Sequence, residues 1–152
     1  MVADSFDATD EDEVVIVVQD TTPPEVSVSV GTDSLWPPNH KMVDVGFSFE
    51  VLDNCDPEPE LLIDVTSDER TATAPGAGGP KHAPDAEITE DGRVFLRAER
   101  SGKGDGRVYE IRATVTDTFG NTGSSSVSVK ANHSKSKEAI DSGQDYDATL
   151  MN

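Results

Sequence analysis

Carboxylate and amide side chains gather in three short polar segments that lie far apart in the sequence. Their oxygens are the hard ligands that calcium prefers, with about six to eight of them around one ion. The candidate ligands are Asp20, Asp53, Asn54, Asp56, Asp117 and Asn121. None of these segments has the spacing of an EF-hand loop, so a calcium site would form only if the fold brings them together. The alternative is that these residues are present because Asp and Asn form turns well.

Residue types that support catalysis or zinc binding are scattered along the chain. His40, His82 and His133 fall in separate predicted loops without the paired spacing of a zinc site, so we expect no zinc centre. The sequence contains no GxSxG or HExxH motif and no suggestive pairing of Cys55 with a histidine. We therefore predict that the chain is not an enzyme.

Two aromatic residues have predicted structural roles. Trp36, the only tryptophan, precedes Pro37 and Pro38 in a turn, where we expect it to close one end of the core. The alternative is an exposed indole that stacks on a sugar ring. Tyr109 stands near the start of a clear strand, which is the position of a tyrosine corner, whose hydroxyl bonds to backbone upstream.

The charge of the chain excludes some classes of partner. Thirty acidic and twelve basic residues give a formal net charge of -18, which repels nucleic acid and anionic membranes and attracts divalent cations or basic partners. The one cysteine, Cys55, excludes a disulfide within the chain. No run of about 18 apolar residues could span a membrane, and the acidic residues 1–12 do not resemble a signal peptide, so an export signal would belong to a longer parent chain.

Alternating apolar and polar residues predict β-strands throughout the middle of the chain. The period of two covers residues 26–30, 43–51, 61–65, 94–98, 109–116 and 127–129, and a Glu-Asp-Gly turn at 90–92 predicts a hairpin. Only 34% of the residues are hydrophobic and 5% aromatic, which favours a thin, valine-rich core without a large buried active site. We predict an all-β fold, an immunoglobulin-like antiparallel β-sandwich of about seven strands.

Two composition changes divide the chain into three parts. Residues 1–19 are an acidic lead followed by the β-branched run Val14 to Val18, which is apolar on both faces and predicts the end of a preceding module or a donor strand. Residues 20–131 form the predicted sandwich, because the two prolines at 23 and 24 mark a boundary. Residues 132–152 are a polar tail.

Several short motifs together resemble a known family. The chain resembles bacterial immunoglobulin-like repeats related to hyalin-repeat (HYR) modules in five segments: Asp-Thr-Thr-Pro-Pro at 20–24, Leu-Trp-Pro-Pro-Asn-His at 35–40, Asp-Asn-Cys at 53–55, the strand from Tyr109 to Asp117 and Gly-Asn at 120–121. The resemblance covers roughly residues 14–131. It implies a spacer or adhesive unit of a secreted or cell-surface protein. HYR modules usually pair the cysteine of Asp-Asn-Cys with a second one, and Cys55 has no such partner in this sequence.

The sequence therefore predicts a non-catalytic structural or adhesive module of an extracellular or cell-surface bacterial protein. In a sandwich, the start of the first strand and two of the loops lie at one pole, where calcium would rigidify the junction with a neighbouring module. The expected partners are neighbouring modules or copies of the same chain, with a surface glycan or protein as a further candidate. Two alternatives stay open: a fibre subunit whose residues 14–18 complete a neighbour's sheet, and a carbohydrate-binding module using Trp36.

Overall fold

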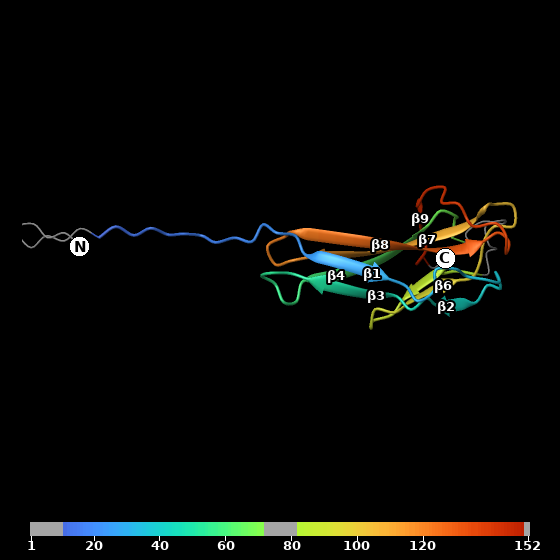
Figure 1. Ribbon diagram of the computed structural model, residues 1–152, viewed down its shortest axis with the longest axis horizontal. Coiled ribbons are helices and arrows are strands. Elements are labelled where there is room, and N and C mark those ends of the chain that lie inside the picture. Colours follow the sequence, from blue (N-terminus) through green and yellow to red (C-terminus); the bar gives the residue numbers. More distant parts are fainter. Residues whose placement is uncertain (1–10, 72–81, 151–152) are drawn as a thin grey trace, which may run out of the picture.

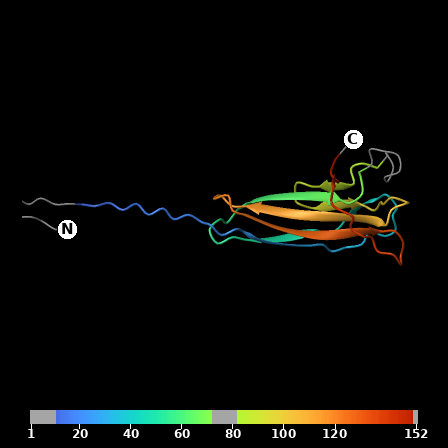
Figure 2. The same cartoon turned by 90° about the horizontal axis from the view of Figure 1, so that it is seen from above.

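A computed structural model describes residues 11–71 and 82–150 of the chain. The described residues form nine strands and no helix, and hence no helix capable of crossing a membrane. Two antiparallel layers pack face to face (Figures 1 and 2). The strands are β1 (Glu25–Ser29), β2 (Met42–Asp44), β3 (Ser48–Leu52), β4 (Glu60–Ser67), β5 (Ala86–Ile88), β6 (Val94–Arg97), β7 (Gly106–Thr116), β8 (Thr122–Asn132) and β9 (Tyr146–Asp147).

The order of the strands is that of an immunoglobulin domain. One layer consists of the pair β1-β3 and the sheet β2-β6-β5, and the other is the sheet β8-β7-β4-β9. Because β2 and β3 are successive parts of one interrupted strand, the first layer has the order A-B-E-D and the second contains C, F and G. The predicted all-β sandwich is confirmed. The count of nine instead of seven arises from the divided strand and from β9.

The division between β2 and β3 occurs at Gly46. This residue has a φ of 62°, a left-handed conformation that favours glycine, and its N–H donates to Asp44 Oδ1 over 2.9 Å. The N–H of Gly31 reaches across to the carbonyl oxygen of Val45 at 2.9 Å. The single long strand predicted for residues 43–51 is therefore wrong at this point, since the chain bends while keeping its place in the layer.

The core lies between the layers. It is rich in valine, as the composition predicted, and also in alanine, which was not predicted. The side chains of β8 and of residues 110–116 of β7 alternate between more and less buried positions, which is the pleated period of two. The buried cluster consists of Leu35, Val45, Phe47, Val65, Ala86, Val94, Leu96, Ala98, Tyr109, Ile111, Ala113, Val129, Ala131 and Ala148.

The residues after β8 belong to the domain, so the predicted boundary at 131 is wrong. Strand β9 pairs with the end of β4, and Ala148 is fully buried. The Ala148 N–H donates to Val65 O at 3.0 Å, while its carbonyl accepts the N–H of Asp85 at 2.9 Å. The segment gave no hydrophobic signal because small alanines and backbone hydrogen bonds hold it, instead of large apolar side chains.

The described part of the predicted N-terminal strand stands apart from the sandwich. Residues 11–19 belong to no strand of the described chain, and they extend away from the domain in Figure 1. The side chains from Val14 to Val18 are 76% to 87% exposed. The described residues thus leave the run uncovered, although its composition favours burial on both faces. Residues 1–10 of the acidic lead lie outside the described part.

Candidate metal centre

The three polar segments singled out in the sequence meet at one end of the sandwich. Asp20 precedes β1, Asp53 follows β3, and Asp117 follows β7. Because β1 and β3 are antiparallel, with Glu25 opposite Leu52, the start of one adjoins the end of the other. One carboxylate oxygen from each of Asp20, Asp53 and Asp117 lies within 4.8 Å of the other two. We call these three residues the aspartate pole.

Each carboxylate of the aspartate pole is held by loop amides through its Oδ1 atom. Asp20 Oδ1 accepts the N–H of Thr22 at 2.9 Å. Asp53 Oδ1 accepts the N–H of Cys55 at 2.9 Å. Asp117 Oδ1 accepts the N–H groups of both Phe119 and Asn121, at 2.9 and 2.8 Å. These are the local turns that Asp forms readily, and they fix where the second oxygen of each group lies.

Two of the Oδ2 atoms at the aspartate pole lack hydrogen-bond partners within the described part of the chain. Asp20 Oδ2 and Asp53 Oδ2 are buried and have no hydrogen-bond partner among the described residues. Asp20 and Asp117 are only 9% and 5% exposed. Turn formation alone does not explain this arrangement, because buried carboxylate oxygens without partners are costly and neighbouring carboxylates repel one another. A cation among them would remove both penalties.

The other three predicted ligands have different places. Asp56 uses both oxygens within the protein, accepting the N–H of Glu58 at 3.0 Å and that of Thr118 at 2.9 Å, so it ties two loops together. Asn121 Nδ2 donates to Asp117 Oδ2 at 2.7 Å and to Asp20 O at 3.2 Å. Asn54 is exposed. The structure therefore assigns supporting roles to Asp56 and Asn121 and leaves Asn54 at the rim.

Two pKa shifts describe the electrostatics of the pole. Burial opposes ionisation of Asp117, but hydrogen bonds from the Asn121 side chain and from loop amides outweigh it and lower the pKa of this carboxyl below its ordinary value. Desolvation raises the pKa of the Cys55 thiol, and the negative charge of Asp20, a hydrogen bond to the Asp20 side chain and the charges of Asp53 and Asp117 raise it further. The pole thus keeps Asp117 ionised and Cys55 protonated, which suits a hard cation bound by oxygen.

The aromatic residues occupy different environments from each other. Tyr109 is fully buried, and its hydroxyl donates to Arg97 O in β6 at 2.9 Å, a backbone acceptor upstream as in a tyrosine corner. Trp36 is 41% exposed, whereas the preceding Leu35 is 2% exposed and joins the core. We predicted that Trp36 closes one end of the core, but Leu35 takes this place, because the turn directs the Leu35 side chain inward and leaves Trp36 partly exposed.

A second cluster was not found by sequence reasoning. His40 and His82, which lie in separate loops without paired spacing, meet at the fully buried Glu99, and these three also offer ligand atoms within 4.8 Å of one another. Beside them, the buried Arg107 pairs with the buried Asp85 at 2.7 Å. No sequence spacing indicated this cluster, because its members come from three segments joined only by the fold. Glu99 follows β6 in phase with the outward residues Phe95 and Arg97, so the alternation of the strand did not indicate its burial.

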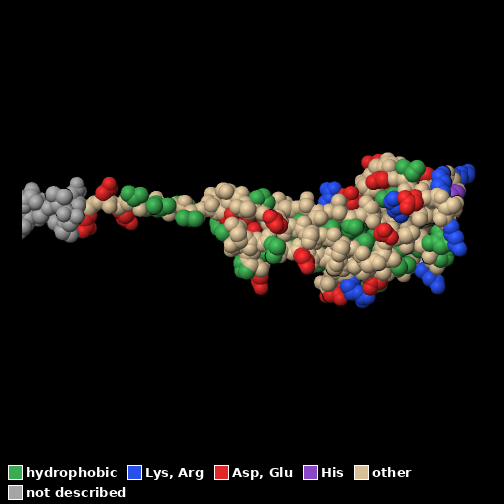
Figure 3. Space-filling view, in the orientation of Figure 1, with side chains coloured by type: hydrophobic (Ala, Val, Ile, Leu, Met, Phe, Trp, Pro, Cys, Tyr) green, Lys and Arg blue, Asp and Glu red, His purple; other side chains and the backbone are tan. Residues whose placement is uncertain are grey.

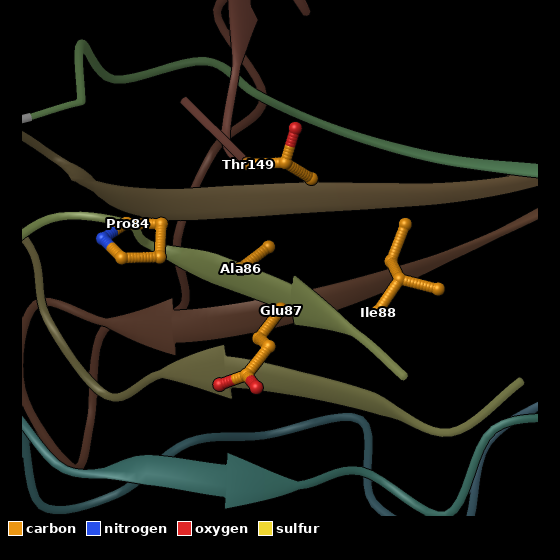
Figure 4. A pocket seen from close by; sticks show the side chains of 5 residues that line it. All are labelled: Pro84, Ala86, Glu87, Ile88 and Thr149. Atoms are coloured by element: carbon orange, nitrogen blue, oxygen red, sulfur yellow. The ribbon is translucent and has the colours of Figure 1, made fainter. Parts of the chain in front are cut away.

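One surface depression of the described residues is mainly apolar. It lies alongside β5 and is lined by Pro84, Ala86, Glu87, Ile88 and Thr149 (Figure 4). Glu87 is its single ionisable lining residue, and in Figure 4 the Glu87 side chain points to the opposite side of β5 from Ile88. The depression is thus mainly an apolar gap beside an edge strand.

Comparison with known proteins finds no matching family model, no matching curated protein and no matching solved structure.

Proposed function

We propose that the chain is a structural or adhesive module of an extracellular protein, and that calcium at the aspartate pole stiffens its junction with the segment before it. The observation that carries this proposal is the pair of buried oxygens, Asp20 Oδ2 and Asp53 Oδ2, which lack hydrogen-bond partners among the described residues beside the ionised Asp117. The resemblance to HYR-type repeats and the charge of -18 support a role outside the cell.

The donor set favours calcium over other divalent ions. All three groups supply hard oxygen, and they come from loops that allow the irregular coordination calcium accepts, whereas magnesium requires near-octahedral geometry. Water and the amide oxygen of the exposed Asn54 can complete the shell. Calcium sites of extracellular modules have a Kd of about 10⁻⁴ to 10⁻³ M, which three carboxylates without a dedicated binding loop can reach.

The position of Asp20 links the ion to the mechanics of the chain. Asp20 is the last residue before Thr-Thr-Pro-Pro, and the exposed segment 11–19 leads directly into it. Its backbone carbonyl is bound by Asn121, and its carboxylate belongs to the pole. Calcium would therefore hold the point at which the preceding segment enters the domain, and the two prolines would carry that restraint into β1.

Calcium should raise the stability of the protein, and asparagine substitutions should abolish this effect. We expect the free energy of unfolding to increase by about 2.7 kcal/mol at a calcium concentration about 100 times Kd. Asp20→Asn and Asp53→Asn each keep the Oδ1 acceptor but remove a charge, so most of the increase should disappear. Without calcium, the same variants should be more stable than the wild type, because repulsion at the pole is relieved. Urea titrations in calcium and in chelator measure both effects.

The matched control is Asp33→Asn, which removes an exposed carboxylate away from the pole. It should retain the full response to calcium. A wild-type protein whose unfolding is the same in calcium and in chelator would contradict the proposal.

A second candidate function is a self-assembling fibre subunit, which the exposure of residues 14–18 favours. Five consecutive β-branched side chains at 76% to 87% exposure are unusual for a soluble surface and suit a strand that completes another copy's sheet. The apolar depression beside β5 (Figure 4) would receive this strand beyond Ala86, because the N–H of Ala86 already donates to Ala148 O at 2.8 Å.

Deleting residues 1–19 should prevent this assembly and leave a folded monomer. The intact chain should form oligomers whose mass increases with concentration in light scattering, and Ile16→Asp should reduce them because a charge cannot enter an apolar gap. Asp12→Asn, outside the apolar run, serves as the control. Monomeric intact protein at high concentration would rule out the fibre function without affecting the calcium proposal.

A further inference from the structure

Two histidines and one glutamate form a compact cluster at the end of the sandwich opposite the aspartate pole. His40 Nδ1 lies 2.7 Å from Glu99 Oε2, and His82 Nδ1 lies 3.1 Å from the same atom. The two imidazole rings are stacked, with centroids 4.3 Å apart and planes 9° from parallel. Figure 3 shows histidine at the end of the molecule farthest from the extended N-terminal segment. Strand β7, of eleven residues, separates the two ends by about 35 Å.

The loops that carry both histidines are held by a single arginine of β6. Arg97 Nη1 donates to the carbonyl oxygen of His40 at 2.9 Å, and its Nη2 donates to that of Pro84 at 2.7 Å. The N–H of His40 donates to Ala98 O at 2.9 Å. His40 has a φ of 65°, which is unfavourable for a residue other than glycine. The backbone is thus fixed in a conformation that brings the two imidazoles together.

Glu99 is buried beside the two histidines and has one oxygen that the described residues leave unsatisfied. Its residue exposure is 0%, and its Oε1 atom has no hydrogen-bond partner among the described residues. The neighbouring carboxylates of Asp85 and Glu69 form ion pairs with Arg107, at 2.7 and 3.4 Å. Within the described chain, no lysine or arginine forms an ion pair with Glu99. Glu99 therefore bonds to two imidazoles through Oε2, while the buried Oε1 is left unsatisfied, which is costly unless a cation joins it.

We propose that His40, His82 and Glu99 bind a zinc ion. Two imidazole nitrogens and one carboxylate are a typical three-ligand set for zinc, with water in the remaining position, whereas calcium prefers oxygen throughout. Zinc bonds of about 2.0 to 2.2 Å place neighbouring ligand atoms roughly 3.3 Å apart. The distance from Glu99 Oε2 would therefore have to increase by about 0.6 Å for His40 Nδ1 and by about 0.2 Å for His82 Nδ1. The histidine side chains are 48% and 34% exposed, which leaves room for this movement.

The proposal is tested by titrating the intact protein with zinc in buffer saturated with calcium, so that the aspartate pole does not compete. Calorimetry should show one zinc ion per chain. His40→Asn and His82→Asn should each weaken binding by about 100-fold, because loss of even an indirect partner of a metal ligand weakens binding about 10- to 100-fold. His133→Asn, which lies outside the cluster, is the matched control and should bind like the wild type.

Cobalt provides a second readout of the same site. Cobalt bound through His40 and His82 should give the intense visible absorption of a four- or five-coordinate ion, and zinc should displace it. Both histidine variants should lose this absorption while keeping the circular dichroism of the folded protein. The proposal is overturned if the wild type binds no zinc, or if all three variants bind it equally.

Discussion

At the scale of single residues, the stability of the domain depends on a buried network of polar groups. Arg107 is fully buried and donates through Nη1 to the Tyr109 hydroxyl at 3.1 Å. Burial lowers the pKa of Arg107, but the neighbouring Tyr109 and Asp85 groups raise it above its ordinary value, so the guanidinium stays charged. The Tyr109 hydroxyl extends the hydrogen-bond network to β6 because it donates to Arg97 O. One hydroxyl therefore connects the two layers of the sandwich.

Replacing Tyr109 by phenylalanine should destabilise the protein by about 1 to 3 kcal/mol, because Arg97 O and an Arg107 N–H would remain buried without this partner. Urea unfolding measures the change. The control is Tyr146→Phe, where an only partly buried hydroxyl is removed and a change below about 0.5 kcal/mol is expected. Equal stability of the two variants would show that the Tyr109 hydroxyl contributes little.

At the scale of elements, the aspartate pole depends on a close approach between β8 and the segment before β1. A Cβ atom built on Gly123 would lie 1.9 Å from Pro24 O. Only glycine allows this contact, which lets residues 20–24 lie close against the start of β8. The contact positions Asp20 even though Gly123 itself provides no ligand.

Gly123→Ala should therefore weaken calcium binding without removing any metal-binding group. The added methyl group must push Pro24 away, which should destabilise the domain by roughly 1 to 3 kcal/mol and displace Asp20 from its neighbours. Gly102→Ala is the control, since nothing lies within 4 Å of its added Cβ. Calcium titration by calorimetry compares the two variants, and an unchanged affinity in Gly123→Ala would separate the pole from this contact.

At the scale of the whole molecule, charge determines how stability depends on pH. The formal net charge is -18, and several carboxyl groups are buried. Desolvation by burial raises the pKa of Asp68, Glu69 and Asp85 above their ordinary values of 3.8, 4.5 and 3.8. The folded state therefore takes up protons at a higher pH than the unfolded state does.

In calcium-free buffer, the free energy of unfolding should increase as the pH is lowered from about 7 to about 5. The raised pKa values favour the folded state until the pH reaches the ordinary values of 3.8 to 4.5, where the gain is complete. Reduced repulsion between surface carboxylates has the same sign. Repeating the urea titrations in about 1 M salt screens the surface charges and isolates the buried groups. A midpoint that falls on acidification over this range would contradict the assignment.

The sequence by itself determined the class of fold and the composition of one pole. Alternating valines can be buried only if strands pack in two layers, and the connections between antiparallel strands then bring Asp20, Asp53 and Asp117 to the same end. Those inferences were accessible because they depend on periodicity and on connectivity, which are properties of the chain read in order.

The tertiary structure alone decided the features that depend on contacts between distant backbone atoms. The bend at Gly46, the return of Ala148 to the core and the inward turn of Leu35 instead of Trp36 have no periodic signal. The meeting of His40 and His82 at Glu99 likewise follows from the hydrogen bonds of Arg97, which fix both loops. The side chains and carbonyl groups that make these contacts lie far apart in the sequence, and no regular spacing connects them.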